Sequence, residues 1–120
     1  MSRRTEKIGD LIQVVLADLV RLRAKDPDLH DAIFSFAGVE VSPDMGHANV
    51  RVSVLGDDAT KGTVLAALVR SEPFLHREMA RELHMRRVPR LSFILDESIE
   101  EADRMTTLMR EVAHSEGREF

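Results

Sequence analysis

A series of arginines between residues 70 and 90 is the feature of this sequence best suited to chemistry. The planar guanidinium group forms forked hydrogen bonds that match phosphate. Pro73 predicts a break between two helices inside this stretch, and a helix that starts there would present free amides to an anion. The pattern therefore predicts phosphate binding, while pairing of neighbouring arginines with Glu78 and Glu82 is the alternative. The arginines are Arg70, Arg77, Arg81, Arg86, Arg87 and Arg90.

The charge distribution supports a cationic surface although the net charge is −4. Residues 1–25 and residues 70–90 each hold six Lys or Arg against three Asp or Glu, and two acidic segments follow them. If the two basic segments meet in space, they form a face that binds polyanions. Ordinary solvated helix faces are the other interpretation. The cations expected to assist the arginine series are Arg3, Arg4, Lys7 and Lys61.

No constellation of residues indicates an enzyme, a metal site or a cofactor. The chain has no cysteine, which excludes disulfides, thiolate metal sites and cysteine nucleophiles. His76 and His84 are eight residues apart, two helical turns, and lack the spacing of a zinc-binding helix. The acids between Asp96 and Asp103 suit the start of a helix better than acid–base catalysis. Without a signal peptide pattern or a membrane-length apolar run, we expect a cytoplasmic protein with no membrane partner.

The elements that must position these residues follow the order α-β-β-α-α-β-α. Apolar periodicity predicts helices over about 4–24, 59–70, 74–85 and 98–112. Alternation predicts strands over 32–41, with a bulge at Gly38, and over 47–55 and 91–95. The helical connection favours a parallel crossover, so we expect an α+β fold with a three-stranded mixed sheet and helices on one face. Residues 1–113 should form one domain and 114–120 a disordered tail.

Several stretches of the sequence resemble bacterial ribosome-binding factor A. They are VEVSPD at 39–44, ANVRVSVLG at 48–56, LHMRRVPRLSF at 83–93 and DES at 96–98. The resemblance runs in register over about residues 3–112. It implies a type II KH fold and a protein without catalytic activity, linked to growth in the cold. It also implies binding to the small ribosomal subunit, with free 30S preferred over 70S, and maturation of 16S rRNA near its 5′ end.

The sequence departs from the resemblance at the position where KH domains hold RNA. RNA-binding KH domains use a Gly-x-x-Gly loop, and this family has Ala-x-Gly at a helix kink. Here the kink motif is Ser71, Glu72 and Pro73, without a glycine. RNA contact should therefore rest on the arginine side chains of a monomer. A KH-fold module that binds protein without direct RNA contact is the alternative function.

Overall fold

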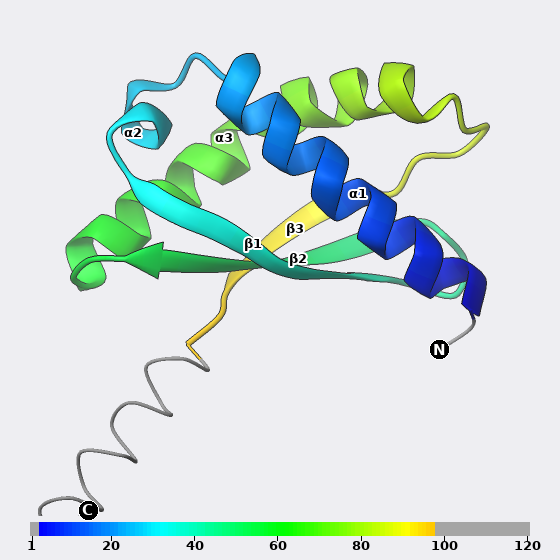
Figure 1. The fold of residues 1–120 in the computed structure, drawn as a ribbon, viewed down its shortest axis with the longest axis horizontal. Helices are drawn as coiled ribbons and strands as arrows, with labels where there is room; N and C mark the ends of the chain where they lie inside the picture. Colours follow the sequence, from blue (N-terminus) through cyan, green and yellow to red (C-terminus); the bar gives the residue numbers. More distant parts are fainter. Residues whose placement is uncertain (1–2, 98–120) are drawn as a thin grey trace, which may run out of the picture.

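The structure, a computed structural model, describes residues 3–97, which form three strands, two long helices and one short helix. The order is α1 (Arg3–Leu22), α2 (Pro27–His30), β1 (Ile33–Val41), β2 (His47–Leu55), α3 (Asp58–Leu83) and β3 (Arg90–Leu95), as Figure 1 shows. The expected α+β class with a mixed three-stranded sheet is confirmed. The helix predicted at 98–112 and the tail at 114–120 lie outside the described residues.

The sheet has the topology that the alternation of the sequence predicts. β1 and β2 pair antiparallel, and their register shifts between Phe36 and Gly38, where a bulge was expected. β2 and β3 pair parallel, and α3 makes the crossover between them. Strand order is β1-β2-β3, so β2 is central and β1 lies at an edge. Alternate residues of β2, from Ala48 to Val54, are buried on the face that the helices cover.

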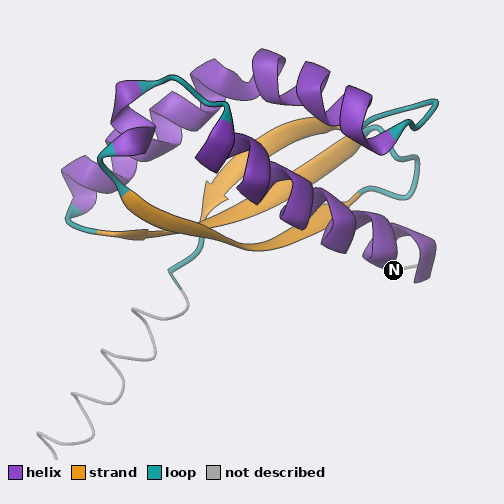
Figure 2. Cartoon of the chain, turned by 45° about the horizontal axis from the view of Figure 1, so that its top comes forward, coloured by secondary structure: helices purple, strands orange, loops and turns teal. Residues whose placement is uncertain are grey.

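Both long helices pack on the same face of the sheet, as Figure 2 shows. α1 contributes Ile12 and Leu16 to the core, and α3 contributes Leu68, Leu75 and Met79; all five are fully buried. This spacing of three to four residues puts one apolar stripe of each helix against the strands. None of the helices described between residues 3 and 97 is long and apolar enough to cross a membrane.

The predicted break at residues 71–73 is wrong, because α3 continues through Pro73 as one helix. Proline removes the amide that would bond to the carbonyl of Val69. Val69 is 58% exposed, so water has access to that carbonyl, and Leu68 and Leu75 anchor both sides to the core. Figure 1 shows α3 changing direction along its length, as expected at an internal proline. The free helix-start amides expected at Pro73 therefore do not exist.

Two helix starts depend on capping aspartates, and for the second of them the sequence pointed to Asp58. Asp26 caps the short helix α2, which the periodicity did not reveal, and its carboxylate accepts from the amide of Asp28. Asp57, rather than the neighbouring Asp58, caps α3. Its carboxylate accepts from the amide and the hydroxyl of Thr60 at 2.8 and 2.7 Å, and these bonds lower the pKa of Asp57.

Candidate functional site

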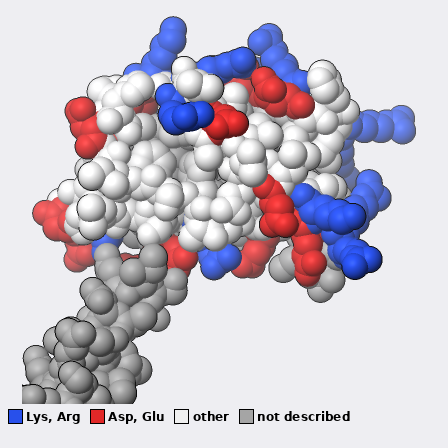
Figure 3. All heavy atoms as spheres, in the orientation of Figure 1, with Lys and Arg blue, Asp and Glu red and all other residues white. Residues whose placement is uncertain are grey.

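Cations from two distant parts of the chain lie at one end of the molecule. Figure 1 places the start of α1 and the loop between α3 and β3 at the same end, and Figure 3 shows Lys and Arg gathered along that edge. All the cations concerned are exposed. We call this set the basic end, and it consists of Arg3, Arg4, Lys7, Arg86 and Arg87.

The turn between β1 and β2 joins the two parts of the basic end. α1 approaches the sheet so closely at Gly9 that an added Cβ would lie 2.5 Å from the carbonyl oxygen of Val39. At the other side of the turn, the amide of Arg90 donates to the carbonyl of Gly46 at 3.0 Å. The Ser42 hydroxyl and the Gly46 amide hold the pKa of Asp44 below its usual range, and the charge of Arg87 adds to this. The contact of α1 with β1 and that of β3 with the turn thus hold both groups of cations at one end.

The second half of α3 adds two exposed arginines to this region. Within residues 3–97, no carboxylate lies within ion-pair distance of Arg77. Arg81 makes only a loose contact of 3.7 Å with Glu78, and its side chain is 79% exposed. Glu78, the acid expected to pair with Arg81, forms a closer ion pair with Arg23, the residue directly after α1, at 2.9 Å. Both guanidinium groups can therefore reach an external phosphate.

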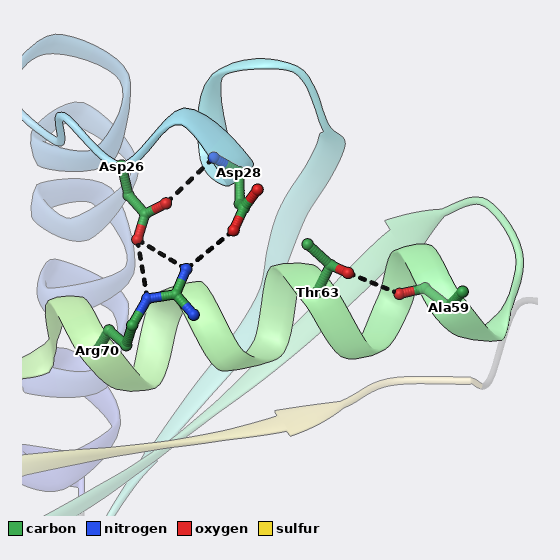
Figure 4. Close-up of polar contacts among 5 residues, drawn as sticks. All are labelled: Asp26, Asp28, Ala59, Thr63 and Arg70. Atoms are coloured by element: carbon green, nitrogen blue, oxygen red, sulfur yellow. Dashed lines mark hydrogen bonds and ion pairs between the residues drawn. The ribbon is translucent and has the colours of Figure 1, made fainter.

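Arg70 belongs to the internal structure of the protein. Its guanidinium donates to the carboxylate of Asp26 at 3.0 and 3.3 Å and to that of Asp28 at 2.9 Å. Figure 4 shows this clamp between α2 and α3, with the bond of 2.9 Å from the Thr63 hydroxyl to the Ala59 carbonyl about two to three turns away along α3. The hydrogen bonds to Asp26, with a smaller contribution from Asp28, raise the pKa of Arg70. Two carboxylates thus occupy the donors that we expected to meet phosphate.

Arg90 is also engaged within the protein, by Glu72 of the kink motif. Glu72 is buried, with 8% of its surface exposed. Its carboxylate accepts from the Arg90 guanidinium and, at 2.9 Å, from the amide of Leu91. His76 completes the arrangement, with its ring nitrogens 3.1 Å from the Val88 carbonyl and 3.3 Å from the Arg90 guanidinium. Glu72 therefore fastens the middle of α3 to the start of β3.

Lys61 and the kink motif, the remaining predicted site residues, do not belong to the basic end. Lys61 is only 6% exposed and so is not part of the exposed basic surface. In the kink motif Ser71 is half-buried, Glu72 is buried and Pro73 is exposed. Glu72 and Pro73 line a shallow groove of ≈460 Å³ between α3 and β3. The structure thus separates the predicted cations into an exposed group and an internally paired group.

Sequence reasoning missed the residues that hold these internal pairs. Arg23, Asp26 and Asp28 lie between α1 and β1, and the acids and arginine they meet lie on α3. The separations of 42 to 55 residues carry no local spacing signal. Within residues 3–97, no group of three or more His, Asp or Glu is arranged to hold a metal ion.

Fold and charge together define a small α+β domain whose exposed cations gather at one end, a class suited to a polyanionic partner. Comparison with known proteins narrows this class. The family model of ribosome-binding factor A matches residues 4–109. The chain belongs to the ribosome-binding factor A family.

Relatives from distant bacteria span nearly the same length. The ribosome-binding factor A of Thioalkalivibrio sulfidiphilus is 41% identical over 106 residues, which cover 88% of this chain and 81% of the relative. That of Geobacter metallireducens is 34% identical over 117 residues, which cover 98% of each chain. The similarity therefore extends over all the elements described above.

Solved structures of the family share the fold. The crystal structure of ribosome-binding factor A from Thermus thermophilus superimposes with a TM-score of 0.68 at 26% identity, covering 78% of this chain and 97% of that one. A homology model of the Thermus thermophilus factor, fitted into the cryo-EM map of its complex with 30S, gives a TM-score of 0.63, also at 26% identity, covering 78% of this chain and 96% of that one. That relative is thus a protein seen on the small subunit.

Proposed function

We propose that this ribosome-binding factor binds the 30S subunit as a monomer in the cytoplasm and assists late maturation of 16S rRNA near its 5′ end, without catalysis. The basic end carries the contact with rRNA phosphates, and Arg77 and Arg81 extend it along α3. The glycine-less kink of this KH-like domain leaves the contact to side chains rather than to a backbone clamp. The protein binds free 30S in preference to 70S.

One observation carries this proposal. Arg86 and Arg87 are exposed, and within residues 3–97 neither has a carboxylate at ion-pair distance. A guanidinium that no carboxylate holds at ion-pair distance keeps its forked donors available for phosphate. The fit of the Thermus thermophilus relative into the map of a 30S complex supports the same partner.

The proposed mechanism is conformational. A protein without a catalytic site assists maturation only by binding one arrangement of its target more tightly than another, because equal affinity for both shifts nothing. Here the favoured arrangement is an immature rRNA conformation near the 5′ end of 16S rRNA. Release follows when the mature arrangement no longer fits the basic end.

Co-sedimentation with purified ribosomal particles at several salt concentrations tests the proposal. Each phosphate contact contributes about 0.7 to 0.9 to the slope of log affinity against log salt. The double variant Arg86→Ala with Arg87→Ala should lower that slope by about 1.5 and weaken 30S binding by about 25- to 60-fold near 0.1 M salt. Association with 70S should be weaker than with free 30S for the unmodified protein.

A matched control removes a charge elsewhere. Lys25 is exposed and follows the far end of α1, a helix about 30 Å long, so Lys25→Ala should leave the slope unchanged. An unchanged affinity and slope for the double variant would show that the basic end does not contact rRNA. Binding to bare rRNA fragments distinguishes direct RNA contact from a protein-interaction module, which would bind only intact subunits.

A further inference from the structure

A second surface, on the face formed by α1 and β1, is unrelated to the basic end. An open groove of ≈830 Å³ runs between the two elements. Val14 and Ala17 of α1 form one wall, and Phe34 and Ser35 of β1 form the other. Figure 3 shows a broad, largely uncharged area on this face. Val14, which is 61% exposed, contributes with Ala17 and Phe34 to an apolar lining that an apolar side chain of a partner could cover.

The β1 wall of the groove is the open edge of the sheet. β1 pairs with β2 on one side, and within residues 3–97 no strand pairs with its other side. Unpaired strand edges bind extended polypeptides by adding a strand. The Gln13 side chain donates to the Phe36 carbonyl at 2.7 Å, and the bulge follows directly. These two features end the available edge, so the open stretch is the first part of β1, from Ile33 to Ser35.

The charges around the groove suit a cationic occupant and not RNA. Asp10 and Asp18 line it, and Asp31 lies between the lining residues His30 and Ala32. The guanidinium of Arg21 is held by Asp18 at 3.3 Å. Within residues 3–97, Asp10 and Asp31 are left without an ion pair; they would repel a phosphate backbone, whereas they would attract Lys or Arg.

We propose that this groove binds an extended polypeptide segment in which Lys or Arg alternates with apolar residues. The segment pairs with the free edge of β1, places apolar side chains against Val14 and Phe34, and places its cations near Asp10 and Asp31. The inference rests on the proposed function, because proteins of the small subunit are the basic polypeptides that this factor meets there. The groove thus gives the factor a protein contact separate from its rRNA contact.

A photo-reactive residue in the groove tests the proposal directly. p-Benzoylphenylalanine replaces Val14, and the variant is irradiated on purified 30S subunits. The matched control carries the same group at Leu55, which is 70% exposed and lies at the end of β2 outside the groove. We expect a nuclease-resistant, protease-sensitive product at least tenfold stronger from position 14, with the link mapping to an extended basic segment.

Two results would overturn the inference. One is a position-14 product that contains rRNA, and the other is no product above the Leu55 control although the variant co-sediments with 30S. Failure to co-sediment would instead refute the proposed function, and this inference with it.

A blocked groove supplies a second measurement. Ala17→Arg fills the groove and repels a cation from an exposed helix position, so it should reduce the position-14 product at least tenfold and leave the salt slope of 30S binding unchanged. Leu55→Arg should alter neither quantity by more than twofold. Equal yields of the position-14 product in the Ala17→Arg and Leu55→Arg variants would exclude the groove as the binding site.

Discussion

The effect of Glu72→Gln on the free energy of unfolding should change sign depending on whether Arg90 is present. The Glu72 side chain is 11% exposed and the Arg90 side chain 55%. Glu72 also accepts from the Leu91 amide. In Arg90→Ala the buried carboxylate loses its cation and keeps only this amide. In Glu72→Gln an uncharged acceptor remains for the amide, and the half-exposed Arg90 takes up water.

These environments determine how much each substitution should lower the free energy of unfolding. Breaking a fully buried pair costs about 3–5 kcal/mol; because Arg90 is half exposed, we expect Arg90→Ala to cost about 2 kcal/mol. Glu72→Gln should cost about 1 kcal/mol, the typical loss of a hydrogen bond to a charged group when an acceptor remains. The double variant holds no uncompensated charge and should also lose about 1 kcal/mol. Glu72→Gln therefore stabilises the protein that already lacks Arg90, with a coupling of about 2 kcal/mol.

Urea denaturation of the four proteins near neutral pH measures this coupling, provided that the m-values agree. The corresponding shift in melting temperature is about 4–8 °C for each kcal/mol in a domain of this size. Additive effects within about 0.5 kcal/mol would refute the reasoning. The reasoning would also be refuted if Glu72→Gln destabilised the unmodified protein and the Arg90→Ala variant equally. Arg90→Ala should also leave the salt slope of 30S binding intact, since its guanidinium is held by Glu72.

Three further substitutions test the helices by the same denaturation measurement. Gly9→Ala should destabilise by about 1–3 kcal/mol, because its Cβ meets the Val39 carbonyl. A Cβ added at Gly62 would meet nothing within 4 Å, so Gly62→Ala should stabilise the protein by about 0.5–1 kcal/mol. Equal effects of Gly9→Ala and Gly62→Ala would contradict the close approach of α1 to the sheet. The lowered pKa of Asp57 stabilises the fold above its ordinary value of 3.8, and this contribution disappears as pH falls through the lowered value. Asp57→Asn should therefore reduce the difference between midpoints at about pH 6 and about pH 3.

The sheet could be predicted from the sequence because its signals are local. The alternation from Ala48 to Val54 fixed the buried face of β2, and Gly38 marked the bulge in β1. The break at Pro73 was wrong for a tertiary reason. A proline disfavours a helix locally, but Leu68 and Leu75 are buried on either side of it, and their packing holds both halves of α3 in one helix.

The candidate site was predictable only in part. The exposure of Arg77, Arg86 and Arg87 follows from their places opposite the apolar stripe or in a loop. The internal roles of Arg70 and Arg90 could not be foreseen, because their acids come from elements that only the fold brings close. Residue type identified the chemistry, but tertiary pairing decided which guanidinium groups remain available for a partner.

That pairing also explains how an acidic protein can carry a cationic end. Away from the basic end, arginines on both long helices and on the strands meet carboxylates, as Arg23 meets Glu78 and Arg51 lies 3.5 Å from Glu40. Such pairs cancel locally and contribute little field at a distance. Within residues 3–97, the cations of the basic end make no ion pair, and neither do acids such as Asp10 and Asp31 on the α1–β1 face; the described part of the chain is therefore a dipole. A dipole of this kind turns the basic end toward a polyanion before contact, and it keeps the acidic groove on the α1–β1 face available for a second, cationic partner.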